Sequence, residues 1–203
     1  MATFQAPAVV GQALRNLLSE SAPRTVFPGV QFSLCVANNL TTPPFPDLGI
    51  SLYLHRVTHN VSRRNLPPRL DSNGERFKPS VPLDLHFLVT AWARRPETQW
   101  ALLAWAIRVF EDSPILPSGF LNQNAGSDTS GEALQVFRED ESVELVGEIL
   151  SLQDATSIWE IARHNQQPSV SFVARSVLID SEIELSVGRP VQSRAFDLAT
   201  PSR

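Results

Sequence analysis

Apolar residues recur along this chain at two spacings, one typical of helices and the other of strands. Residues 7–20 carry an apolar stripe at helical spacing, and Pro7 suits the first turn of such a helix. Residues 30–37 and 83–93 alternate apolar and polar side chains, which predicts half-buried strands. The same reasoning predicts further strands at 49–61, 143–150 and 169–180, and a capped helix that begins near residue 151.

A second long helix, predicted at 97–112, is apolar around most of its circumference. Its apolar side chains cover two faces at helical spacing: Trp100, Leu103, Ile107 and Phe110 on one, and Leu102, Trp105, Ala106 and Val109 around the rest. A helix of this kind is buried on more than one side. The second cover is either another part of the domain or another subunit.

Two segments lack any regular apolar spacing. Residues 62–82 combine Arg63, Arg64 and Arg69 with several prolines, which predicts a long exposed loop or a hairpin arm. These arginines either keep the loop solvated or dock onto an acidic partner. Residues 118–132 are rich in Ser, Gly and Asn, which predicts a loop.

The order of predicted elements defines the fold class. It runs helix, three strands, helix, strand, helix, strand, which indicates one α+β domain with a mixed, mainly antiparallel sheet packed against helices. The strand at 169–180 is apolar on both faces, as expected at the centre of a sheet. We expect this domain to cover residues 1–181 and a C-terminal extension to cover residues 182–203.

Composition narrows the class of function. The chain has 203 residues, 17 Lys and Arg against 21 Asp and Glu, and a formal charge of −4. This acidity argues against nucleic acid as a partner, and no apolar run approaches the roughly 18 residues of a membrane span. The N-terminal residues do not resemble a signal peptide, so synthesis is expected to be cytoplasmic. Cys35 is the single cysteine, which excludes an intrachain disulfide and a multi-cysteine zinc site.

The histidines are the first place to look for chemistry. His55 and His59 share one strand but lie about 13 Å apart at ~3.3 Å per residue, too far to bind one metal ion. If the next strand is an antiparallel neighbour, His59 approaches Asp84 or His86, which would allow a metal or acid/base site. A polar face or an interface face of the sheet is the favoured interpretation. The chain has no phosphate loop, nucleophile elbow or zinc-protease motif, so we expect neither an enzyme nor a cofactor.

Several ordered strings in the sequence resemble one known family. They are Ile50–Asn60 (ISLYLHRVTHN), Arg63–Arg69 (RRNLPPR), Pro82–Ala93 (PLDLHFLVTAWA), Leu103–Leu116 (LAWAIRVFEDSPIL), Ile158–Ile161 (IWEI) and Ser171–Ser181 (SFVARSVLIDS). Together they are similar to the N-terminal domain of tail-terminator, or cap, proteins of extracellular contractile injection systems. These are the phage-tail-like particles of the virulence-cassette and antifeeding-prophage type.

The resemblance implies a structural role without a cofactor. A homohexameric ring would sit on the distal end of the sheath and inner tube, end their polymerisation and hold the sheath extended. The partners would be other copies of the chain, the sheath protein and the inner tube protein, with no nucleic acid and no membrane. Such a protein would be assembled in the cytoplasm of the producing bacterium and released extracellularly with the particle.

Candidate contact residues follow from combining this role with the sequence pattern. Trp105, Val109 and Leu102 are expected at the ring interface, because the helix that carries them is apolar on two sides. The candidates for sheath or tube contacts are Arg63, Arg64 and Arg69. One alternative is a baseplate, connector or cargo-loading adaptor of the same particle. A less favoured alternative is a metal-dependent enzyme that uses His59, Asp84 and His86.

Overall fold

The computed structural model describes the chain apart from residues 1–3, 42–45, 72, 128–132, 162–164 and 186–203. Its elements are, in chain order, α1 (Ala6–Ser21), β1 (Gln31–Cys35), α2 (Ala37–Thr41), β2 (Leu48–His59), the 3-10 helix η1 (Val61–Arg63), β3 (Arg69–Leu70), β4 (Arg76–Phe77), β5 (Val81–Ala93), α3 (Pro96–Asp112), β6 (Ile115–Pro117), α4 (Ser118–Gln123), β7 (Ser142–Glu148), α5 (Leu152–Ile161) and β8 (Ser169–Ile179). No helix in these described ranges is long and apolar enough to cross a bilayer.

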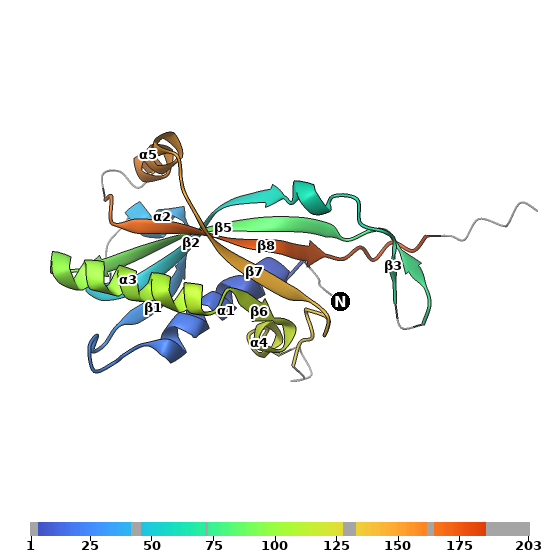
Figure 1. Ribbon diagram of the computed structural model, residues 1–203, viewed down its shortest axis with the longest axis horizontal. Helices are drawn as coiled ribbons and strands as arrows, with labels where there is room; N and C mark the ends of the chain where they lie inside the picture. The colour runs from blue at the N-terminus through green and yellow to red at the C-terminus, as the bar shows by residue number, and fades with distance from the viewer. Residues whose placement is uncertain (1–3, 42–45, 72, 128–132, 162–164, 186–203) are drawn as a thin grey trace, which may run out of the picture.

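Six strands form one sheet in the order β1-β2-β5-β8-β7-β6. Only β1 and β2 run parallel, and every other pair of neighbours is antiparallel. Helices α1, α3 and α4 lie on one side of the sheet, and α5 lies on the other (Figure 1). The predicted α+β class with a mixed, mainly antiparallel sheet is therefore confirmed.

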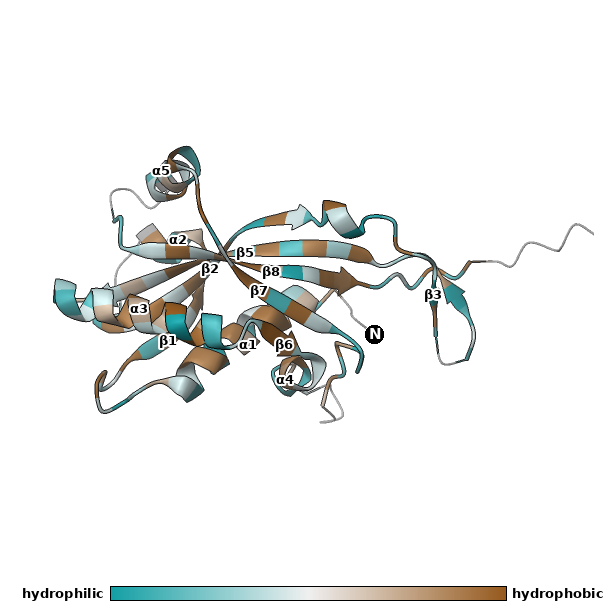
Figure 2. Ribbon diagram, viewed as in Figure 1, coloured by the Kyte–Doolittle hydropathy of each residue, from teal (hydrophilic) through white to brown (hydrophobic). Residues whose placement is uncertain are grey.

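The main core lies between the sheet and helices α1, α3 and α4. Alternation puts Leu85, Phe87, Val89 and Ala91 of β5 on this face, where each is almost completely buried. Figure 2 shows hydrophobic residues gathered where the strands and these helices meet. The predicted strand at 169–180 is β8, which lies between β5 and β7 as its two apolar faces indicated.

The opposite face of the sheet carries a smaller apolar cluster. Leu40, Leu88, Trp92 and Trp159 are buried together there, beneath α2 and α5. The indole nitrogen of Trp92 donates to the Ser51 hydroxyl at 2.8 Å, which satisfies the polar end of this buried ring. Polar side chains occupy the sheet beyond this cluster, so helices cover the second face incompletely.

The predicted arm at 62–82 is a hairpin that projects from one end of the sheet (Figure 1). Strands β3 and β4 pair with each other and not with the main sheet. The chain after β8 adds a third segment, because the Lys78 amide donates to Ile183 and the Leu185 amide donates to Arg76. The described start of the expected C-terminal extension thus lies along the arm, while residues 186–203 fall outside the described residues.

A bulge in β8 lies next to the point where its pairing with β7 ends. Arg175 and Ser176 together oppose Asp84 of β5, and Ser176 adopts a left-handed φ of 60°. The Asp84 carboxylate accepts hydrogen bonds from the Ser176 amide at 2.9 Å and from the Asn60 side chain at 2.9 Å. On the other side, pairing between β7 and β8 ends at Glu144 and Arg175.

Candidate docking surfaces

One aromatic side chain of α3 is largely exposed, and it is not one of the three residues expected at a ring interface. Trp100 is 61% exposed, although the sequence pattern grouped it on one apolar face with Phe110, which is buried. Leu102 is fully buried in the chain's own core. Trp105 packs against Phe27 and Phe32 with ring centroids 6.3 and 5.9 Å apart. Of these side chains, Trp100 is accessible at the helix surface, and Trp105 and Val109 are partly exposed.

The three arginines predicted to contact sheath or tube have different surroundings. Arg63 and Arg64 are exposed at the end of η1. Arg69 is 9% exposed because its guanidinium stacks 4.2 Å above the Phe77 ring and lies 3.6 Å from Asp180. The hairpin turns Arg69 inward, so Arg69 stabilises the arm and only Arg63 and Arg64 remain available at the surface.

Buried charges join the root of the arm to the domain. The Asp180 side chain is 3% exposed and accepts a hydrogen bond from the Ser80 hydroxyl. It also lies 3.5 Å from the guanidinium of Arg138, which pairs in turn with Glu141 at 2.7 Å. Burial raises the pKa of Glu141, and the hydrogen bond and charge of Arg138 oppose this shift. A buried pair of this kind fixes geometry more than it adds stability.

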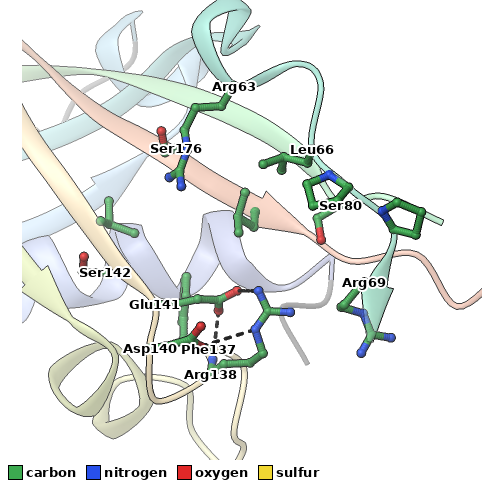
Figure 3. Close-up of a pocket in the computed structure, with 14 residues that line it drawn as sticks. Arg63, Leu66, Arg69, Ser80, Phe137, Arg138, Asp140, Glu141, Ser142 and Ser176 are labelled. Carbon is green, nitrogen blue, oxygen red and sulfur yellow. Dashed lines mark hydrogen bonds and ion pairs between the residues drawn. The ribbon is translucent and has the colours of Figure 1, made fainter. Parts of the chain in front are cut away.

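A groove of about 370 Å³ lies beside this ion network (Figure 3). The arm root forms one wall with Leu66, Pro67 and Pro68, and the segment before β7 forms the other. Arg63 reaches toward the groove from η1, next to Ser176 of β8 (Figure 3). The remaining lining residues are Arg69, Ser80, Phe137, Arg138, Asp140, Glu141, Ser142, Val143 and Leu178.

His59, Asp84 and His86 do not form a common site. His59 lies opposite Leu83, so its side chain points to the sheet face away from that of Asp84, which lies opposite Thr58. The Asp84 carboxylate accepts hydrogen bonds at the bulge of β8. Among the described residues, no three His, Cys, Asp or Glu side chains are placed to hold a metal ion.

The second sheet face instead carries a polar network centred on His86. Its ring nitrogens lie 3.0 Å from the Glu148 carboxylate and 3.1 Å from the Thr58 hydroxyl. Burial favours protonation of Glu148, but hydrogen bonds from His86 and Ser171 outweigh it and lower the pKa of the carboxyl. Burial, followed by the charge of His86, lowers the pKa of neighbouring His55 to about 4. Both oxygens of the Glu148 carboxylate accept hydrogen bonds within this network. The network therefore links side chains of β2, β5, β7 and β8.

Sequence reasoning missed the groove at the arm root. Its walls come from residues 63–69, 137–143 and 176–178, which are far apart in the chain. None of these segments carries a motif, and their proximity follows from the pairing of β8 with β5. A hint was present in Leu66-Pro67-Pro68, an apolar string inside a segment predicted to be exposed.

The fold resembles that of a protein whose structure is known. A protein described as the PVC sheath/tube terminator of an extracellular contractile injection system, in its extended state, aligns with a TM-score of 0.57 and 12% identity. The alignment covers 96% of this chain and 64% of that protein, so the chain spans less than two thirds of its length.

A second structure, the tube-terminating cap of the anti-feeding prophage, aligns with a TM-score of 0.48 and 12% identity, covering 95% of this chain and 60% of that one. No curated protein matches the chain. The family model of the Pvc16 N-terminal domain matches residues 9–193, which is most of the sequence. The chain belongs to the Pvc16 N-terminal domain family.

Proposed function

We propose that the chain is the structural cap, or tail terminator, of a contractile injection particle. The observation that carries this proposal is the family match over residues 9–193, together with a fold similar to that of a sheath/tube terminator. In this role the protein forms a ring on the distal end of the sheath and inner tube. The ring ends their polymerisation and stabilises the extended state.

A ring of six copies fits the symmetry that such a role needs. Contacts in a closed ring are heterologous, so each copy uses two different surfaces. The exposed face of α3 around Trp100, with the accessible edges of Trp105 and Val109, is proposed as one of them. Arg63 and Arg64 at the arm root are proposed to contact the sheath or the inner tube. Assembly takes place in the bacterial cytoplasm, and the cap leaves the cell with the particle.

Electron microscopy of particles made without this protein tests the role. Sheaths of irregular length or sheaths that contract spontaneously are expected, with normal baseplates. Missing baseplates with normal sheath length would instead indicate the connector or adaptor role. Complementation with the wild-type chain restores a narrow length distribution if the cap assignment is right.

A pair of variants tests the ring interface within the same assay. Trp100→Glu places a charge on a side chain that is already exposed, so the monomer keeps its fold while ring contacts are lost. Trp100→Phe keeps an aromatic side chain and is the matched control. A Trp100→Glu protein that forms rings and caps sheaths of normal length would remove α3 from the interface.

A further inference from the structure

The projecting arm has two faces, and they differ in what they contact. Strand pairing joins Arg69 to Phe77 and Leu70 to Arg76. Because side chains alternate along a strand, these two pairs point to opposite faces of the arm. The face with Arg69 and Phe77 meets the domain, where Arg69 lies 3.6 Å from Asp180. The opposite face, called the outer face below, carries Leu70, Arg76, Lys78, Ile183 and Leu185.

The outer face of the arm is apolar and basic. Leu70 and Ile183 are 65% and 56% exposed, so two large apolar side chains are open to solvent there. Arg76 and Lys78 are exposed beside them. No ion pair between described residues involves either cation. A face of this kind fits a partner surface that is both acidic and apolar.

The chain itself has a surface with that chemistry at the far edge of its sheet. Ile115 of β6 is 60% exposed and lies opposite Glu144 of β7, so the two side chains are neighbours on one face. Strand β6 is the last of the sheet in the described chain, which leaves this edge open. Glu139 and Asp140 are exposed just before β7. The acidic rim consists of Ile115, Glu139, Asp140 and Glu144.

Negative charge predominates on the acidic rim. Residues 139–144 read Glu-Asp-Glu-Ser-Val-Glu, with no basic residue among them. Arg175 lies 3.9 Å from Glu144, and Arg138 lies 3.6 Å from Asp140. Exposed pairs at such distances are weak, so both carboxylates can accept a second cation.

We propose that the outer face of the arm binds the acidic rim of the adjacent copy, in the ring proposed above. Leu70 and Ile183 contact Ile115 of that copy, and Arg76 and Lys78 meet its carboxylates. The inference rests on the proposed ring and adds a contact to the one proposed for α3. Because the outer face and the acidic rim are different surfaces, the contact is heterologous, as a closed ring requires.

The orientation of the arm favours another copy over the chain's own rim. Asp180, which faces Arg69, also lies 3.5 Å from Arg138, the residue directly before the acidic rim. The inward face of the arm is therefore the one that lies toward the chain's own rim. The outer face points away from it, on an arm that projects beyond the sheet (Figure 1). In a ring, a neighbouring subunit brings a second rim to this face.

Charge reversal in the full-length chain tests the proposal. Lys78→Glu and Glu144→Lys each place like charges in contact, so each variant alone should need at least about tenfold more protein to form rings. An equal mixture of the two variants should form rings as the wild type does, because opposite charges meet again when the copies alternate. Arg24→Glu makes the same charge change at an exposed position outside both surfaces and is the control. Sedimentation velocity over a concentration series measures assembly.

Disulfide crosslinking gives a second readout that does not depend on charge. One tagged form carries Ile183→Cys and the other Ile115→Cys, both with Cys35→Ser. A disulfide that joins the two tags is expected after mild oxidation, because these side chains lie close only across the proposed contact. Val26→Cys, which is exposed outside both surfaces, replaces Ile115→Cys as the control and should crosslink at least about tenfold less.

The outcomes separate this contact from the proposed function. If Lys78→Glu forms rings as Arg24→Glu does, or if the mixture fails to form them, the proposal is overturned while the ring stands. Intact Lys78→Glu rings that bind particles less tightly would also overturn it, since the outer face would then contact sheath or tube. If the wild-type chain forms no ring, the ring and this contact fail together.

Discussion

At the scale of single residues, two tryptophans of α3 have different surroundings. Trp105 packs against Phe27 and Phe32, whereas Trp100 is mostly exposed. Trp105→Ala is expected to lower the free energy of unfolding by about 2–3 kcal/mol, since it removes a half-buried aromatic ring from its contacts. Trp100→Ala should change it by less than about 0.5 kcal/mol. Urea denaturation of both variants measures these values, and equal losses would contradict the assigned burial.

The hydrogen bonds that the Asp84 carboxylate accepts at the bulge predict a second effect on stability. Asp84→Ala removes the acceptor for the Ser176 amide and the Asn60 side chain. Leaving these donors unsatisfied is expected to lower the free energy of unfolding by about 1–3 kcal/mol. Asp47→Ala is a matched control, since Asp47 forms an exposed ion pair with Arg94. A stable Asp84→Ala protein would mean that the bulge does not depend on this side chain.

The lowered pKa of His55 predicts how the stability of the fold changes with pH. Its pKa is about 4 in the folded chain and near 6.5 when unfolded, so the unfolded chain binds more protons between these values. The stability contribution is therefore complete above pH 6.5 and is lost as pH falls toward 4. His55→Gln is expected to reduce this slope, measured as the denaturation midpoint at several pH values. An unchanged slope in His55→Gln would contradict this linkage.

At the scale of elements, the arm is expected to depend on a buried ion pair. Asp180→Asn removes the negative charge that faces Arg69 and Arg138. Breaking one partner of a buried pair costs about 3–5 kcal/mol. Hydrogen exchange of amides in β3 and β4 should therefore become faster, while amides of α3 keep their protection. Asp112→Asn, at an exposed helical pair, is the control, and unchanged exchange in the arm would contradict this role.

Elements with long apolar periods could be predicted, and short ones could not. Helix α3 was predicted to within a residue because its apolar residues recur over four turns. Strand β5 was predicted except for its first two residues, because alternation extends from Leu83 to Ala93. Helix α4 lies in a segment predicted to be a loop. Its Asn122 accepts hydrogen bonds from the amides of Val136 and Phe137 and donates to the Phe137 carbonyl, a contact between distant segments. Strand β6 has three residues, too few for a period to be recognised.

At the scale of the whole molecule, the sequence predicted surface residues correctly only where local pattern alone decides whether a side chain is exposed. Arg63 and Arg64 lie at the surface as expected, because no apolar period surrounds them. Arg69 was predicted at the surface, yet the hairpin buries it over Phe77. The strings that resemble cap proteins identified the family, whereas the groove at the arm root depends on strand pairing and on the bulge at Ser176, which no local pattern encodes.

The exposed arginines predict how attachment to the particle depends on salt. If Arg63 and Arg64 dock onto an acidic surface of sheath or tube, replacing both with Ala should weaken binding to purified particles about tenfold at low salt. The difference between wild type and variant should shrink as salt rises, because exposed charges are screened beyond about 10 Å at 0.1 M. Co-sedimentation of the full chain with particles lacking the cap, over a salt series, measures both effects.

The control for this series carries the same change in charge elsewhere. Arg94→Ala with Arg95→Ala removes two exposed arginines near the start of α3, at the end of the domain away from the arm. An equal loss of binding in this control would mean that net charge alone governs attachment. A loss confined to Arg63 and Arg64 would localise the contact to the arm root, where the groove also opens.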